Sequence, residues 1–119
     1  MATFSKIKLG NSTNGRGILV AATSSPGTLI HTTSTTATTI DEVWLYAQNT
    51  DTTARKLTLE WGGTGSGDLI EFTVPAEDGL YVIVAGLVIK GNATPLVVRA
   101  FAATANVINI AGYVNRITA

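Results

Sequence analysis

Hydrophobic and polar residues alternate along most of this chain in short runs. In residues 55–61, Leu57 and Leu59 fall on one side of an extended backbone. Thr58 and Glu60 fall on the other side, as expected for a strand with one buried and one solvent-facing surface. Such runs, separated by Gly, Pro, Asn, Asp and Ser, predict antiparallel strands. The expected strands are residues 3–9, 17–23, 28–33, 41–49, 55–61, 68–74, 80–89, 96–102 and 106–117.

The spacing of these runs predicts an all-β fold. Eight to nine short strands at regular intervals are typical of an antiparallel β-sandwich of a jelly-roll-like kind. The turn signals agree, because Asn14-Gly15 tolerates positive φ angles and residues 62–67 form a glycine-rich hairpin tip. A length of 119 residues suits one hydrophobic core. We therefore expect a single domain over residues 1–119, in which residues 1–17 are a candidate for an extended N-terminal arm.

Residues 80–89 differ from the other runs because they carry no charged residue on either face. A strand of this composition is expected to be buried on both sides. Two interpretations remain open. In the first, a neighbouring subunit covers the outer face of the strand. In the second, the strand is central in its sheet and its outer face lies under a loop of the same chain.

The surface is unusually poor in charge. Lys plus Arg and Asp plus Glu number 8 each, and charged residues make up 13% of the chain, against about 25% in ordinary soluble domains. The basic residues are scattered, so we expect no nucleic-acid partner. No apolar window reaches the ~18 residues that would span a bilayer and no secretory signal is recognisable, so we expect no membrane partner and synthesis in the cytoplasm. With zero net charge and 45% hydrophobic residues, the chain is expected to form a homo-oligomer.

Candidate catalytic and metal-binding residues are sparse. The absence of cysteine excludes disulfides, thiolate metal sites and Cys nucleophiles. The lone histidine, His31, has no carboxylate or nucleophile nearby in sequence, so we expect an ordinary strand residue there. Asp41 and Glu42 are adjacent and should point to opposite faces of a strand, while Glu60 and Glu71 form a glycosidase pair only if neighbouring strands bring them together. We therefore expect no enzyme, no catalytic or metal site and no cofactor.

Two aromatic residues of one expected strand are candidates for binding. Trp44 and Tyr46 share a face with Glu42 and Gln48. Three interpretations are open for this pair: packing in the core, an anchor for a protein interface, or a surface that stacks on a sugar ring.

Four segments of the chain resemble small proteins encoded near the major capsid gene of tailed bacteriophages. They are residues 40–51 (IDEVWLYAQNTD), residues 57–63 (LTLEWGG), residues 70–87 and residues 107–116 (VINIAGYVNR). Such proteins are similar in size and β-content to capsid decoration, or cement, proteins, which sit as trimers on icosahedral heads. The resemblance implies a structural virion protein on the capsid surface, made in the host cytoplasm, whose partners are its own copies and the major capsid protein.

The same resemblance suggests where the contacts lie. In a trimer, the expected capsid contacts are Phe4, Lys6, Lys8 and Arg16 of the N-terminal arm. The expected subunit contacts of the trimer are Trp44, Tyr46, Leu80, Tyr81, Val82, Val84, Leu87 and Ile89.

The alternative function is a carbohydrate-binding or host-adhesion β-sandwich module, such as a head-fibre, neck or tail component.

Overall fold

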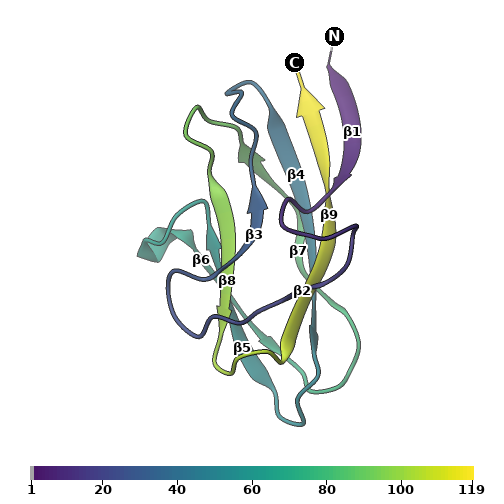
Figure 1. Ribbon diagram of the computed structural model, residues 1–119, viewed down its shortest axis with the longest axis vertical. Helices are drawn as coiled ribbons and strands as arrows, with labels where there is room; N and C mark the ends of the chain where they lie inside the picture. The colour runs from purple at the N-terminus through teal and green to yellow at the C-terminus, as the bar shows by residue number, and fades with distance from the viewer. Residues whose placement is uncertain (1) are drawn as a thin grey trace.

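Two antiparallel sheets pack face to face, and the alternating side chains of their strands meet between them (Figure 1). The structure is a computed structural model that describes residues 2–119. The strands are β1 (Thr3–Lys8), β2 (Ile18–Leu19), β3 (Thr28–Thr32), β4 (Ile40–Asn49), β5 (Arg55–Trp61), β6 (Leu69–Val74), β7 (Tyr81–Lys90), β8 (Val97–Ala102) and β9 (Ile108–Thr118), and a short 3-10 helix, η1 (Ser66–Asp68), precedes β6.

Sheet A has the strand order β1-β9-β4-β7, with β2 also paired to β9, and sheet B has the order β3-β8-β5-β6. The prediction of an all-β antiparallel sandwich is confirmed. The pairs are nested along the chain: β5 with β6, β4 with β7, β3 with β8 and β1 with β9.

The core lies between the sheets and is built by the inward residues of the longest strands. Val43, Leu45 and Ala47 of β4 face Leu57 and Leu59 of β5, and all five are buried. Each fully buried Leu or Val stabilises the fold by about 1.5–3 kcal/mol relative to an exposed one. The other buried apolar residues are Leu9, Ile18, Val20, Ile30, Val74, Val84, Ile89, Val98, Ala100, Ala102, Ile108, Ile110 and Val114.

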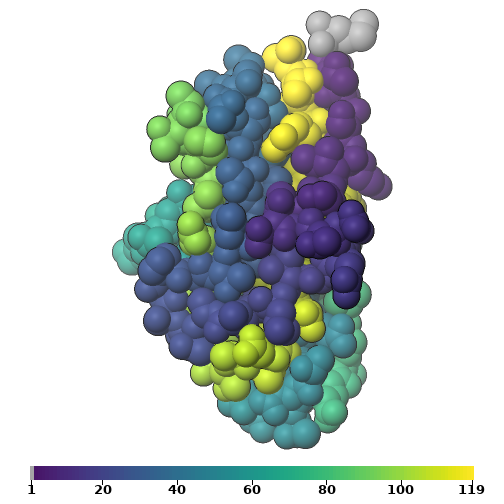
Figure 2. Space-filling model, in the orientation of Figure 1, coloured from purple at the N-terminus to yellow at the C-terminus, as the bar shows by residue number. Residues whose placement is uncertain are grey.

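The segment between β1 and β3 closes one open side of the sandwich, and Figure 2 shows it in purple and indigo across the front. It starts beside sheet A, where Val20 N–H donates to Ile108 O at 2.9 Å. It then reaches sheet B, where Ala102 N–H donates to Ala22 O at 3.1 Å. Because the backbone changes sheets here, β2 has two residues, whereas the sequence predicted a strand over residues 17–23.

Strands β4 and β9 approach each other closely at Gly112. This residue has φ +158°, and a Cβ atom placed on it would lie 2.0 Å from the Trp44 carbonyl oxygen. No side chain fits at that distance, so glycine at this position allows the central pair of sheet A to form around Trp44.

We predict that Gly112→Ala destabilises the fold by about 2–4 kcal/mol, because the added methyl group forces β4 and β9 apart. Urea unfolding of both proteins measures this difference. Gly67→Ala is the matched control, since a Cβ at Gly67 meets nothing within 4 Å. Equal loss of stability in the two variants would contradict the close approach.

Candidate functional site

Three ionisable side chains meet inside the sandwich and join its two sheets. His31 of β3 and Asp41 of β4 are both buried, and their Nε2 and Oδ2 atoms lie 2.8 Å apart. Arg116 of β9 donates to Asp41 through Nε at 2.8 Å and through a terminal nitrogen at 2.9 Å. This bidentate pair fixes the carboxylate, and the histidine connects it to sheet B.

The hydrogen bonds of His31 define its protonation. Its Nδ1 accepts a hydrogen bond from Gly10 N–H at 2.8 Å, so the proton of the neutral ring sits on Nε2 and is donated to Asp41. Burial lowers the pKa of His31 and outweighs the opposing effect of Asp41. Burial alone would raise the pKa of Asp41, but hydrogen bonds from Arg116 and His31 hold it below its ordinary value. The three groups thus form a neutral histidine next to an ion pair.

A histidine bonded to an aspartate also occurs in catalytic triads. Both ring nitrogens of His31 are already bonded, so neither is free to accept a proton from a nucleophile. The sequence prediction of an ordinary strand residue missed the carboxylate, because Asp41 lies ten residues away on the other sheet. As predicted, Asp41 and Glu42 point to opposite faces of β4.

The second candidate for acid chemistry, Glu60, is also committed to structure. Its carboxylate accepts hydrogen bonds from Ser25 Oγ at 2.5 Å and from Gly27 N–H at 2.6 Å. Glu60 was predicted on a solvent-facing side, and that prediction is wrong because the loop between β2 and β3 buries it. Glu71, its proposed partner, instead forms an exposed ion pair with Lys56 at 2.7 Å. β5 and β6 pair with Thr58 opposite Glu71 and Glu60 opposite Leu69, and the two carboxylates have separate partners.

The aromatic face is the name used below for Trp44, Tyr46 and Tyr113 on the outer surface of sheet A. Trp44 stacks on Tyr113 with ring centroids 6.1 Å apart and an angle of 9° between the planes. Its Nε1 donates to Glu42 Oε1 at 2.8 Å, and Asn115 donates to the same oxygen at 2.9 Å. These two hydrogen bonds lower the pKa of Glu42. The interpretation that Trp44 and Tyr46 pack in the core is wrong, because their side chains alternate outward from the buried residues of β4.

Strand β1 extends this surface at the edge of sheet A next to β9. Lys6 places its Nζ 4.8 Å from the centroid of the Tyr113 ring, a cation–π contact. Phe4 is 72% exposed, and Lys8 is exposed beside it. Three of the four predicted capsid contacts thus line one edge strand. Residues 3–8 of the candidate arm are hydrogen-bonded to β9, and Met1 lies outside the described residues.

The opposite edge of sheet A is apolar. Within residues 2–119, β7 pairs with β4 alone, so it is an edge strand, and the interpretation of a central strand under a loop is wrong. Among the predicted subunit contacts, Val84 and Ile89 are corrected, because both are buried in the core of their own chain. Tyr81 is half-buried. Three further predicted contacts, Leu80, Val82 and Leu87, are 45–59% exposed, and Val88, which was not among the predicted residues, is 52% exposed. These four residues are named the β7 patch below.

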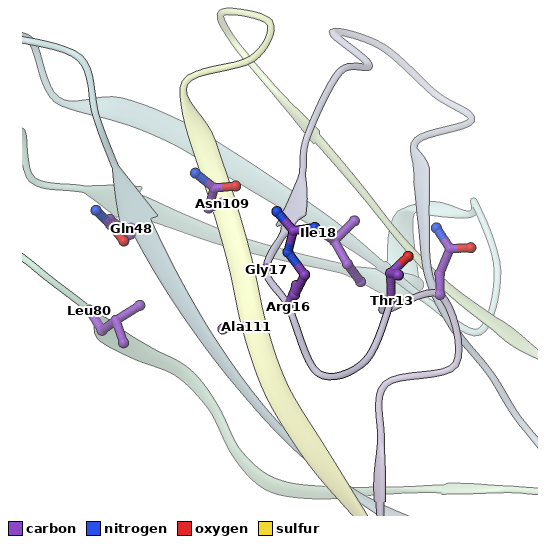
Figure 3. A pocket seen from close by; sticks show the side chains of 9 residues that line it. Thr13, Arg16, Gly17, Ile18, Gln48, Leu80, Asn109 and Ala111 are labelled. Carbon is purple, nitrogen blue, oxygen red and sulfur yellow. The ribbon is translucent and has the colours of Figure 1, made fainter.

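A hollow of about 510 Å³ opens where the loop after β1 meets sheet A, and Figure 3 shows its lining. Sequence reasoning placed Arg16 on the capsid and missed the hollow, because its residues come from four separate segments of the chain. It is named the Arg16 groove below, after its one charged residue. Its main side chains are Asn11, Thr13, Arg16, Gln48, Leu80 and Asn109.

Neither a cluster of metal-binding side chains nor a membrane-spanning helix is found in residues 2–119. Within residues 2–119, no three His, Cys, Asp or Glu side chains gather closely enough to hold a metal ion. No helix in the described part of the chain has the length and apolar character needed to cross a membrane. Comparisons with protein-family models, with curated proteins and with solved structures find no significant match.

We predict that the stability of the protein falls as the pH drops below about 6.5. The folded pKa of His31 lies below its ordinary value of 6.5, so the unfolded chain takes up this proton first. The stabilisation is therefore complete above pH 6.5 and is lost toward the folded pKa, with a slope of up to about 1.4 kcal/mol per pH unit. Asp41 adds a loss of the same sign at lower pH, because its folded pKa is also lowered.

Urea unfolding at about pH 7.5 and about pH 5 measures this loss. His31 is the one histidine of the chain, so His31→Gln should be less stable at neutral pH and should show a much smaller change between the two pH values. An unchanged pH dependence in His31→Gln would show that another group causes it.

Proposed function

We propose that this chain is a structural protein of a tailed-phage virion, which binds the capsid as a homotrimer and works by adhesion between proteins. The observation that carries the proposal is the β7 patch. Its four large apolar side chains lie exposed along one edge of a protein with little surface charge. Apolar groups gathered in this way favour burial against another protein surface, with a gain of roughly 25 cal/mol per Å² removed from water.

The geometry of β7 favours contact through side chains. The register with β4 shifts between Val43 and Trp44 and again between Leu45 and Tyr46, so β7 carries two irregularities along its length. Gly86, at the first of them, has φ +76° and lies under the Trp44 ring. Bulges of this kind disrupt the free edge of a strand and oppose its continuous pairing with another strand. The expected subunit contact is therefore apolar packing on the β7 patch.

The arrangement of sheet A provides two separate surfaces. β7 and β1 are its opposite edge strands. A ring of copies that meet through β7 leaves β1 free, with exposed Phe4 and Lys8, to contact the shell. Closed cyclic symmetry covers the same patch on every copy, and the number of three copies follows from the sequence resemblance. Double-sheet jelly rolls occur in viral capsid and lectin domains, and this analogy of fold adds to the sequence resemblance.

We predict that the wild-type protein is trimeric and that Val82→Asp and Val88→Asp, made separately, each shift it toward monomer. A buried carboxylate without a partner opposes association. Light scattering coupled to size-exclusion chromatography measures the mass over a range of concentrations. Thr73→Asp, on the exposed edge strand β6 of sheet B, is the control and should remain trimeric. A wild-type protein that is monomeric at every concentration would refute this part of the proposal.

We also predict that the protein co-sediments with empty heads assembled from the major capsid protein of the phage that carries its gene. Phe4→Ser should weaken this binding about tenfold, because the exposed ring loses its contact with the shell. Leu69→Ser removes an exposed apolar side chain from sheet B and should bind normally. No co-sedimentation of the wild-type trimer would refute the capsid as its partner.

A further inference from the structure

The polar side chains of the Arg16 groove are uncommitted. Within residues 2–119, the side chains of Thr13, Arg16, Gln48 and Asn109 make no hydrogen bond, whereas Asn11 already donates to Leu29 O at 2.8 Å. No carboxylate lines the groove, and Arg16 has no ion-pair partner among the described residues. The groove therefore offers one positive charge together with free amide and hydroxyl groups, which complements an anionic, hydroxyl-rich ligand.

The backbone places these polar side chains around one hollow. Gln48 and Asn109 are directly opposite each other in the β4–β9 register, on the outer surface of sheet A. Gly17 passes close to Asn109, since a Cβ placed on it would lie 3.7 Å from Asn109 Oδ1. In Figure 3 the Asn109 amide points toward the Arg16 guanidinium, and Gln48 and Leu80 lie on the other side of β9. A bound ligand would thus meet polar groups from both sides of one central strand.

The aromatic face begins next to this hollow. Ala111 lines the groove and is the register partner of Tyr46, and the stacked pair of Trp44 and Tyr113 follows in the next row of the sheet. A pyranose ring has one face of C–H groups that packs on an aromatic ring and a rim of hydroxyls that bonds to amides. The volume of about 510 Å³ lies within the range of roughly 300–1,000 Å³ that is usual for small-molecule sites.

We propose that the Arg16 groove binds a saccharide that carries a carboxylate, with Arg16 paired to the carboxylate and with Gln48, Asn109 and Thr13 bonded to hydroxyls. The neighbouring ring of Tyr46 supports the next sugar along the sheet. Leu80 belongs both to the groove and to the β7 patch, whereas Val82 and Val88 do not line the groove. Variants at position 88 therefore separate the test of the groove from the test of the trimer.

The test is a titration of the full-length protein with glucuronic acid, followed by the NMR signals of the Gln48 and Asn109 side-chain amides and the Gly17 amide. Glucose, acetate and inorganic phosphate are titrated in parallel. Saturable shifts are expected with glucuronic acid, and binding should weaken about tenfold in Arg16→Gln. Lys90→Gln, which removes an exposed cation of β7 outside the groove, should bind as the wild type does. Val88→Asp, the variant predicted above to shift toward monomer, should also keep binding.

The parallel titrations show which part of the proposal each possible result would overturn. Equal affinity for glucuronic acid and glucose would overturn the role of the charge. Equal affinity for acetate or phosphate would show an anion site that does not recognise sugar, and would overturn the saccharide. No shift at any concentration, or loss of binding in Lys90→Gln as large as in Arg16→Gln, would overturn the site itself. The oligomeric state of Val88→Asp tests the proposed trimer and does not test the saccharide site.

Discussion

Strand β7 carries apolar side chains on both faces, yet it lies at the edge of sheet A. On the inner face Val84 and Ile89 join the core, whereas Leu87, which the register places opposite Val43, stays 45% exposed. The outer side chains remain in water, and the charge-poor sequence supplies few ionised groups around them. The most direct way to satisfy this constraint is a second protein surface, and the proposed assembly follows from it.

Inside the sandwich, ionisable groups are used to hold the sheets together. His31, Asp41 and Arg116 connect β3 to β4 and β9, and Glu60 fastens the loop between β2 and β3 to sheet B. Every hydrogen-bonding group of this kind that is buried in the described residues has a partner. Satisfied networks of this kind stabilise one arrangement of the two sheets.

The sequence predicted the strands well because alternation is a local property of the chain. The close agreement for residues 55–61 and 80–89 is an example. The pairing of His31 with Asp41 and the burial of Glu60 were not predictable, since both depend on segments that meet only after the sheets pack. The same limit applies to β7: its composition predicted burial on both faces and left open what covers the outer face, and only the strand order shows that it is an edge. The Arg16 groove was missed because its side chains come from separate segments.

The most direct test of the central claim is the mobility of a spin label on the outer side of β7. The chain has no cysteine, so Val88→Cys and Thr73→Cys each provide one labelling position. If copies associate through the β7 patch, the electron paramagnetic resonance spectrum of the label at position 88 broadens as the protein concentration rises, while that at position 73 stays narrow. Equal mobility of both labels at all concentrations would contradict the account.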